Sequence, residues 1–407
     1  MTTLPGLGLK LPASWGVATL SEVTSKIGSG ATPRGGSSVY VASGPALIRS
    51  QNVHDHEFKP EGLAFLSRET ATALRGATVE TGDVLINITG DSILRTVIVP
   101  ETALPARVNQ HVAIVRSNEK IDPGFLQKWL SLPLMKDYML GHSSGGTRKA
   151  ITKGHLQSFP IPLPPIEEQR AIAATLGALD GKIESNRRAI ELMVELVRAR
   201  FASDFDVDQA DDGVAIGEIV DINSRRKLAR GEEATYVSMS SLPEFSPAVL
   251  EWEKRAFGSG QKFVNGDVLM ARITPCLENG KTAVVDMLDD GEVGWGSTEY
   301  VVLSPRGAFS TPWIYALTRH ETIRDWAIGR MTGTSGRQRF QACGFHEYRI
   351  QEPDPAVLAA FNDFAVPMFC KVSQARDEIK LLEQLRDALL PELFSGRIRI
   401  PNEGAVA

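Results

Sequence analysis

One long stretch of the chain, from Pro164 to Phe205, places its apolar residues with the period of a helix that packs on another helix. The apolar positions step by fours and threes, which is a heptad pattern that includes one asparagine. These positions are Ile172, Leu176, Leu179, Ile183, Asn186, Ile190, Met193 and Val197. Pro165 precedes the stretch, and Glu167 and Glu168 put negative charge in its first turn. The pattern predicts a long helix with an apolar stripe that needs a partner.

A second stretch near the C-terminus carries the same spacing and offers that partner. Its apolar positions are Ala365, Met368, Val372, Ala375, Ile379, Leu382 and Leu389. The first helix leads into the second globular part, and the second helix starts from it, so antiparallel pairing needs the shortest connection. We therefore expect a two-helix antiparallel coiled coil. Asn186 either sets its register, a known use of one buried polar residue in such a seam, or lies on an exposed flank without a role.

The parts of the chain outside these helices repeat one another. Each repeat contains the same order of turn, β-rich and helical patterns and ends in a Gly/Ser/Thr loop with basic residues. The paired segments are 16–18 and 213–215, 82–85 and 266–269, 111–117 and 299–305, 125–139 and 313–328, and the loops 142–151 and 331–340. The sequence therefore predicts an α+β fold with an internal duplication and a pseudo-two-fold axis. The predicted segments are a first domain at 1–163, helix A at 164–206, a second domain at 207–354, helix B at 355–396 and a tail at 397–407.

Composition fits two globular domains and excludes other classes. The 407 residues are 43% hydrophobic, and no run of about 18 apolar residues predicts a membrane span. The first residues lack the basic start and apolar block of a secretory signal. The three cysteines, Cys276, Cys343 and Cys370, are too scattered for a disulfide framework or a zinc site. We therefore expect a cytoplasmic protein with reduced thiols and no bound metal.

Charge is distributed unevenly, although the net charge is only -5. Residues 1–165 hold 16 Lys and Arg against 12 Asp and Glu, whereas residues 166–212 hold 6 against 11. Residues 213–354 hold 16 against 19, so the second globular part needs local basic clusters to meet a polyanion. The run 224–230, SRRKLAR, is such a cluster.

Three phrases together resemble the specificity subunit of type I restriction-modification systems. They are LPPIEEQRAIAATL (163–176), HSSGGTRKAI (142–151) and LRDALLPELFSGRIRI (385–400). The resemblance covers essentially the whole chain, although QEPDPAVLAAF (351–361) departs from the usual phrase before the second helix. It implies a subunit that catalyses nothing and binds no cofactor, with two target-recognition domains that each read half of an asymmetric double-stranded DNA target. It also implies two modification subunits, which carry S-adenosylmethionine, and motor-nuclease subunits, which use ATP and Mg.

The length of the helical stretches agrees with a spacing role on DNA. A coiled stretch of about 30 residues at 1.5 Å each is roughly 45 Å long. One turn of B-DNA is about 34–36 Å long. We therefore expect the helix pair to set the distance between the two DNA half-sites. The resemblance implies that the pair also docks the modification subunits.

Candidate DNA contacts are chosen by residue type and by position on loops and strand edges. Arg, Gln and Asn can pair with base edges, Lys and Arg neutralise phosphates, and Gly lets the backbone approach closely. Each residue could equally belong to a solvated turn or face. The candidates are Arg34, Arg49, Gln51, Asn52, Arg107, Asn109, Gln110, Gly145, Gly146, Thr147, Arg148, Lys149, Arg225, Arg226, Lys227, Arg272, Thr274, Asn279, Lys281, Gly333, Thr334, Ser335, Arg337, Gln338 and Arg339.

Catalytic motifs are weak or incomplete in this sequence. The match to Gly-x-Ser-x-Gly at 141–145 follows a predicted helix, whereas a nucleophile elbow follows a strand. His54 and His56 could grip a metal, but no further Cys/His cluster lies nearby. Two alternatives to the DNA-reading subunit remain. One is a specificity subunit for a partner that combines methylase and nuclease, and the other is a coiled-coil scaffold whose globular ends bind proteins.

Overall fold

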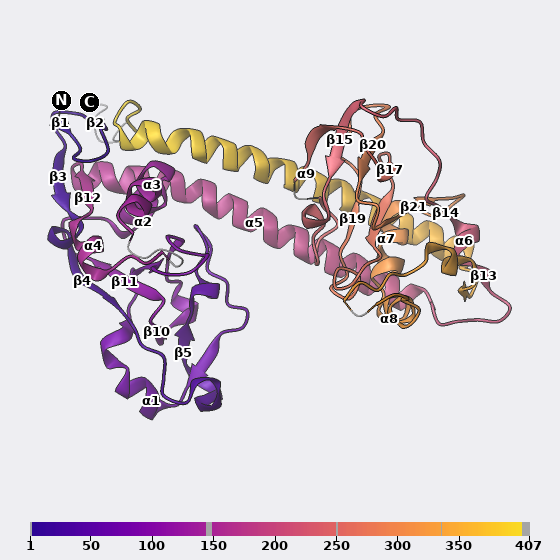
Figure 1. Cartoon of the computed structure of the whole chain (residues 1–407), viewed down its shortest axis with the longest axis horizontal. Helices are drawn as coiled ribbons and strands as arrows, with labels where there is room; N and C mark the ends of the chain where they lie inside the picture. Colours follow the sequence, from indigo (N-terminus) through magenta and orange to yellow (C-terminus); the bar gives the residue numbers. More distant parts are fainter. Residues whose placement is uncertain (1, 144–148, 250, 335, 401–407) are drawn as a thin grey trace. The chain divides into compact units, whose positions relative to one another are not determined.

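The computed structural model describes residues 2–143, 149–249, 251–334 and 336–400, and it divides into two compact units (Figure 1). Unit 1 comprises Met1–Lys182 and Leu382–Ala407, and unit 2 comprises Ile183–Leu381. Each unit therefore contains one globular part and one half of each long helix. The predicted segments 164–206 and 355–396 contain the long helices α5 (Ile166–Asp204) and α9 (Pro355–Phe394). The predicted domain boundaries stay a prediction, since the compact units divide both helices.

Unit 1 contains two four-stranded sheets. One has the order β4-β11-β8-β9, with all neighbours antiparallel, and the other has the order β6-β5-β10-β7, with β5 and β10 parallel. The strands are β4 (Thr24–Ser29), β5 (Tyr40–Ile48), β6 (Ala64–Leu66), β7 (Thr78–Val79), β8 (Val84–Asn87), β9 (Thr96–Ile98), β10 (Ala106–Val108) and β11 (Val112–Ser117). The smaller elements are β1 (Thr2–Thr3), β2 (Lys10–Leu11), β3 (Gly16–Thr19), β12 (Pro160–Leu163), α1 (Arg68–Ala73) and α4 (Lys153–Ser158), and β3 pairs with β12.

Unit 2 repeats this architecture strand for strand. Its sheets have the orders β14-β21-β18-β19 and β16-β15-β20-β17, and β15 and β20 are again parallel. The elements are β13 (Val214–Ala215), α6 (Ile216–Ile219), β14 (Val220–Ile222), β15 (Glu233–Val237), β16 (Glu253–Ala256), β17 (Gln261–Phe263), β18 (Val268–Ala271), β19 (Thr282–Val284), β20 (Gly294–Gly296), β21 (Tyr300–Pro305) and β22 (Arg349–Ile350). The matching orders confirm the predicted α+β class and the duplication.

Each predicted short helix is in fact two helices. The pattern at 125–139 forms α2 (Pro123–Ser131) and α3 (Pro133–Gly141), and the pattern at 313–328 forms α7 (Thr311–Arg319) and α8 (Glu321–Gly329). In unit 1 the break falls at Leu132, because Pro133 disfavours helical geometry in the residue before it. In unit 2 His320 takes the same extended conformation, with φ −65° and ψ 137°.

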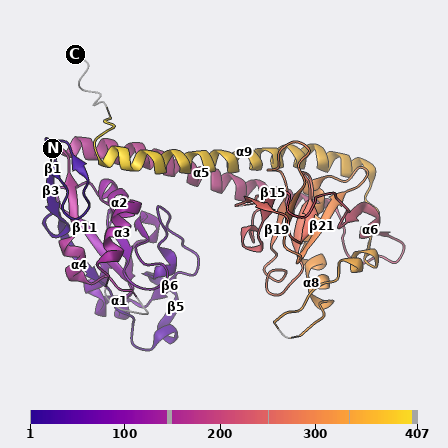
Figure 2. The same cartoon turned by 45° about the horizontal axis from the view of Figure 1, so that its top comes forward.

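The two long helices pack on each other within each unit, in opposite directions. In unit 1 the beginning of α5 and the end of α9 share one core cluster, which contains Ile172, Leu176, Leu390, Leu393 and Phe394. In unit 2 the end of α5 shares a cluster with the beginning of α9, which contains Val194, Val197, Phe201, Leu358, Phe361, Ala365 and Val372. Figure 2 shows α5 and α9 side by side. The predicted antiparallel pair is confirmed.

The predicted seam residues are buried or half-buried, with one shift in the pattern. Asn186 is 6% exposed, and its Nδ2 donates to Glu378 Oε2 of α9 at 2.8 Å. The next buried position after Ile190 is Val194, at 3% exposure, while Met193 is only partly buried. A straight α-helix drifts against a strict heptad, so the buried stripe moves by one residue along this length.

By length and composition alone, α9 is apolar enough to cross a membrane. One such helix is weak evidence, since the core helix of a folded domain passes the same test. Buried residues of α9 belong to the cores of the two units, including Phe361 and Phe394 at 0% exposure. Packing therefore accounts for part of the apolar content of α9.

Candidate nucleic-acid interface

A buried aspartate at the start of the central strand is neutralised by arginine in both units. In unit 1, Arg116 Nε lies 2.7 Å from Asp83 Oδ1. In unit 2, Arg226 Nη2 lies 2.7 Å from Asp267 Oδ2, while Ser304 takes the strand position of Arg116 and donates to Asp267 Oδ1 at 2.6 Å. Since Asp267 is only 2% exposed, the Arg226 guanidinium is held in an ion pair with a buried carboxylate. Arg226 is thus paired within its own unit, whereas its neighbours Arg225 and Lys227 are exposed.

The loops that follow the paired short helices reach the same end of the central sheet in both units. In unit 1 an isolated bridge joins Ala150 to Thr89, directly after β8. In unit 2 the equivalent bridge joins Arg339 to Ile273, directly after β18. The candidates Gly145, Gly146, Thr147, Arg148 and Ser335 lie outside the described residues. Lys149, which adjoins the first bridge, is exposed.

In unit 2 two arginines at this end of the sheet share one carboxylate. Arg339 Nε lies 2.9 Å from Glu299 Oε1, and Arg272 Nε lies 3.2 Å from Glu299 Oε2. Their side chains remain 37% and 24% exposed, so Glu299 orients both guanidinium groups without enclosing them. Thr274 N donates to Gln338 O at 3.1 Å and ties the two loops together. Gly333, Thr334 and Arg337, in the loop that ends at Arg339, are exposed.

The unit 1 candidates divide into exposed and internally bonded side chains. Arg34, Gln51 and Gln110 are exposed. Asn52 is 0% exposed and its Nδ2 donates to Lys59 O and Glu61 O, while Asn109 is 7% exposed and its Oδ1 accepts from His111 N. The amides of these two asparagines therefore hold their own loops.

Four further candidates, two arginines of unit 1 and two residues of unit 2, donate hydrogen bonds within their own unit. Arg107 Nε donates to Ala71 O at 2.9 Å, and Arg49 Nη2 donates to Gly62 O. In unit 2, exposed Asn279 donates to Glu244 Oε1 at 3.0 Å, and Lys281 Nζ donates to Met239 O at 3.3 Å. These side chains are half-buried apart from Asn279, so their bonds fix the loops that carry the exposed candidates.

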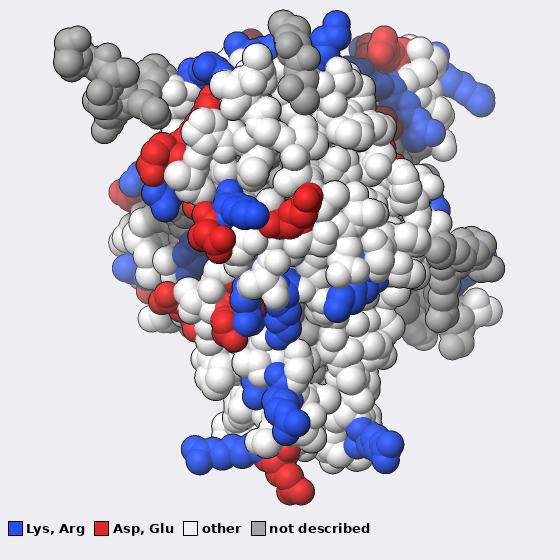
Figure 3. All heavy atoms as spheres, turned by 90° about the vertical axis from the view of Figure 1, so that its left-hand side faces the viewer, with Lys and Arg blue, Asp and Glu red and all other residues white. Residues whose placement is uncertain are grey.

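Charged residues are dispersed over the face of the molecule shown in Figure 3. Figure 3 shows Lys and Arg scattered among uncharged residues and some Asp and Glu, with no continuous basic patch on the face seen there.

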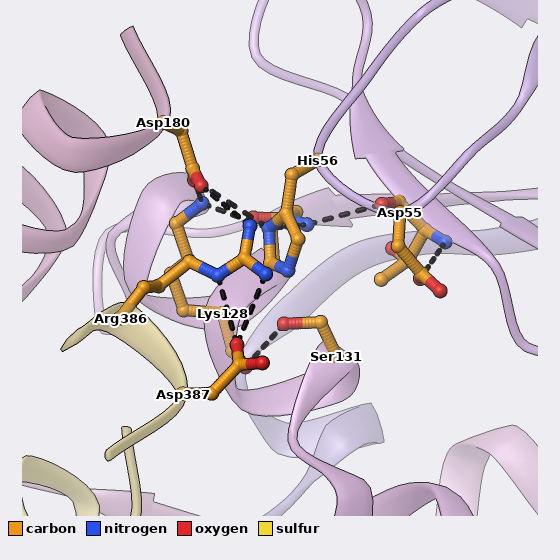
Figure 4. Close-up of polar contacts among 9 residues, drawn as sticks. Asp55, His56, Lys128, Ser131, Asp180, Arg386 and Asp387 are labelled. Carbon is orange, nitrogen blue, oxygen red and sulfur yellow. Dashed lines mark hydrogen bonds and ion pairs between the residues drawn. The ribbon is translucent and has the colours of Figure 1, made fainter. Parts of the chain in front are cut away.

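Unit 1 also contains a charged cluster that no sequence motif predicts, drawn in Figure 4. Lys128 of α2 and Arg386 of α9 both bind Asp180 of α5, with Arg386 Nη1 at 3.1 Å from Asp180 Oδ1. The side chains of Lys128, Asp180 and Arg386 are 7%, 14% and 15% exposed. His56 lies against them, with Nδ1 3.0 Å from Lys128 Nζ. The four residues are far apart in sequence and match no motif, so only the fold brings them together.

Burial, together with the charge of Lys128, lowers the pKa of His56 to about 4. The unfolded chain binds a proton there near pH 6.5, so between about pH 4 and 6.5 the unfolded state binds more protons than the folded state. The free energy of unfolding of unit 1 is therefore expected to be highest above pH 6.5 and to fall by about 3 kcal/mol toward pH 4. Denaturant titrations across this range should show a weaker pH dependence in His56→Gln. His142→Gln replaces an exposed histidine and should leave the dependence unchanged.

Fold and site together define a class: a duplicated protein in which each α+β unit presents basic and amide side chains at the same end of its sheet. Comparison with known proteins agrees. Residues 67–195 match the family model of the type I restriction modification DNA specificity domain. Over 426 aligned residues the chain is 21% identical to the type I restriction enzyme MjaIX specificity subunit of Methanocaldococcus jannaschii, covering 96% of this chain and 95% of that protein. The chain is therefore similar to type I restriction-modification specificity subunits, over residues 67–195 by the family model and over nearly its whole length by this relative.

Two Escherichia coli relatives match over shorter segments. The chain is 27% identical over 155 residues to the EcoEI specificity subunit and 30% identical over 151 residues to the EcoBI specificity subunit. These segments cover 37% of this chain in both cases, and 26% and 31% of the relatives, so the chain spans about a third or less of their length. The crystal structure of the S subunit from M. genitalium has the same fold, with a TM-score of 0.60, 16% identity and coverage of 97% of this chain and 99% of that one. The family match and the full-length relative agree with the predicted resemblance to type I specificity subunits.

Proposed function

We propose that this chain reads double-stranded DNA and that each unit recognises one half of a bipartite, asymmetric target. The observation that carries the proposal is the duplicated placement of the loops at 149–150 and 332–339 beside the ends of β8 and β18. The same loop position carries different side chains in the two units, which is what two different half-sites require. Phosphate contacts position each unit, and Arg and Gln side chains discriminate bases.

The helix pair α5 and α9 separates the two reading surfaces and docks two modification subunits. Several large apolar side chains on these helices are exposed, which favours a protein partner. They are Leu192 at 48%, Leu196 at 50%, Leu381 at 65% and Leu385 at 45%. In the assembled complex the modification subunits supply S-adenosylmethionine, and motor-nuclease subunits supply ATP and Mg chemistry. The scattered thiols favour a cytoplasmic setting for this assembly.

Salt dependence of DNA binding tests the proposal. For each phosphate that the protein neutralises, log K should fall with log salt by a slope of about 0.9. The double variant Arg225→Gln/Lys227→Gln removes two exposed cations of unit 2 and should make the slope shallower by up to about 1.8. Fluorescence anisotropy with duplex DNA, on the chain assembled with its modification subunits, measures this change.

A charge-matched control comes from the helices. Arg170→Gln/Arg188→Gln removes two exposed cations that pair with Glu167 and Glu191 on α5, and it should leave the slope unchanged. A complex that binds no duplex DNA even at low salt would refute DNA reading and favour the scaffold alternative. Methylation and cleavage by one single partner chain would favour the other restriction-modification architecture.

A further inference from the structure

Arg319 and Arg324 of unit 2 border one turn, the charge of Arg198 acts on Arg319, and none of the three has an ion-pair partner within the described ranges. They are Arg198 on α5, Arg319 at the end of α7 and Arg324 on α8. Arg319 is 3% exposed; one of its nitrogens, Nη1, donates to Gly280 O, and its buried Nε has no hydrogen-bond partner. A Cβ built on Gly280 would collide with Arg319 Nη1 and lie 3.4 Å from Arg324 Nη1, so both guanidinium groups border the same turn. Arg324 Nε is also buried without a partner.

The charges around this cluster do not balance. Burial lowers the pKa of Arg319, and the neighbouring charges of Arg198 and Arg324 lower it further. The one carboxylate whose charge opposes this effect is Glu244, and it is the weakest influence. Its Oε1 accepts a hydrogen bond from Asn279 at 3.0 Å, and no ion pair joins Glu244 to the three arginines in the part of the chain that the structure describes. A cluster with this excess of positive charge favours an anion from outside.

The duplication shows how unit 1 balances the equivalent place. Lys136 and Ser131 occupy the positions of Arg324 and Arg319, 188 residues earlier in the paired helices. Lys136 Nζ binds Asp55 Oδ2 at 2.6 Å, and Asp55 Oδ1 also accepts from Thr96 N at 3.2 Å (Figure 4 labels Asp55). Unit 1 thus pairs Lys136 with a carboxylate of its own loop, whereas Glu244, at the position of unit 2 equivalent to Asp55, accepts from Asn279 and forms no ion pair with the described arginines.

The position of the cluster indicates which anion it takes. The loop 272–281 contacts Arg319 through Gly280 at one end, and at its other end Thr274 bonds to Gln338 of the proposed DNA-reading loop. Arg198 and Arg324 are half-buried and so keep accessible surface. Arg319 is buried and adds positive charge beneath that surface. Guanidinium groups offer paired donors that suit phosphate oxygens.

We infer that Arg198, Arg319 and Arg324 form a phosphate site of unit 2, and that a backbone phosphate of the bound DNA supplies the counter-charge that Asp55 supplies in unit 1. This inference rests on the proposed function. The contact is independent of base sequence, so it positions unit 2 on the duplex and does not select the half-site.

The test compares Arg324→Gln in unit 2 with Lys136→Gln in unit 1. Both variants lose one positive charge at equivalent positions, but only Arg324 is expected to meet phosphate. The slope of log K against log salt should become shallower by about 0.9 in Arg324→Gln and stay unchanged in Lys136→Gln. The loss of affinity should be the same on specific and non-specific duplexes. Arg324→Lys keeps the charge and should retain most of the slope.

Further measurements separate this inference from its rivals. Arg198→Gln should reduce the slope in the same way, and thermal unfolding identifies any variant whose loss comes from misfolding. If the wild-type complex binds DNA with a steep salt slope that neither variant changes, the phosphate site is refuted while the proposed function stands. An unchanged slope with weaker assembly of the modification subunits would instead assign the arginines to an acidic protein partner. A wild-type complex that binds no DNA refutes the proposed function itself.

Discussion

Replacing Asp180 by asparagine should destabilise unit 1 by about 3–5 kcal/mol, which is a large part of the stability of an ordinary domain. The carboxylate binds Lys128 and Arg386, and all three side chains are at most 15% exposed. Its removal leaves two buried cations near each other without a counter-charge. Denaturant unfolding of the full chain measures the loss. Hydrogen exchange should place it in α2 and in the last turns of α9.

Unit 2 provides the control for this prediction. At the positions equivalent to Lys128, Asp180 and Arg386 it carries Ala316, Phe369 and Val197, all of them buried. The triple variant Lys128→Ala/Asp180→Phe/Arg386→Val transfers this apolar set into unit 1. We expect it to be close to wild-type in stability, or more stable, because apolar packing replaces charges that are costly to bury. A triple variant as unstable as Asp180→Asn would show that the ion cluster cannot be replaced by packing.

Inserting one heptad into both long helices should lengthen the spacer of the recognised DNA target and leave both half-sites unchanged. The insertions belong between Lys182 and Ile183 in α5 and between Leu381 and Leu382 in α9, where the two units divide. Seven residues keep the heptad register and add about 10.5 Å, which corresponds to about three base pairs. Methylome sequencing of cells that carry the variant complex reads the spacer directly.

An insertion into α5 alone serves as the control for the helix pair. It shifts Asp180 and Asn186 relative to each other but leaves their partners Arg386 and Glu378 in place on α9. The single insertion should therefore destabilise the protein and abolish methylation, with no shift to a new spacer. Altered half-site sequences after the double insertion would contradict the spacing role of the helices.

The sequence predicted features that rest on repetition over many residues. The heptad stripe predicted α5, α9 and their antiparallel pairing, and the repeated segments predicted the matched sheets. Local sequence signals predicted the ends of the short helices less completely. Pro133 marks the break between α2 and α3, but nothing comparable marks the break at His320, where the backbone is extended all the same.

Side-chain roles that depend on long-range contacts could not be predicted. Asn52 and Asn109 lie on polar strand edges in the sequence, yet the fold buries them and uses their amides internally. Arg226 belongs to the most basic run of the chain, but Asp267 lies 41 residues away and only the sheet brings them together. The arginines at 198, 319 and 324 are individually unremarkable by position, since their shared excess of charge exists only in three dimensions.

The division of the long helices between the units has a consequence for synthesis on the ribosome. Phe394 lies against Phe125 and Trp129, with ring centroids 4.9 and 5.5 Å apart, so the core of unit 1 includes residues from the last part of the chain. Residues 183–381 of unit 2 are continuous and emerge before that segment. The unit that is translated second is therefore the first that can complete its core. The N-terminal residues must stay unaggregated until α9 has emerged, against the usual N-to-C order of domain folding.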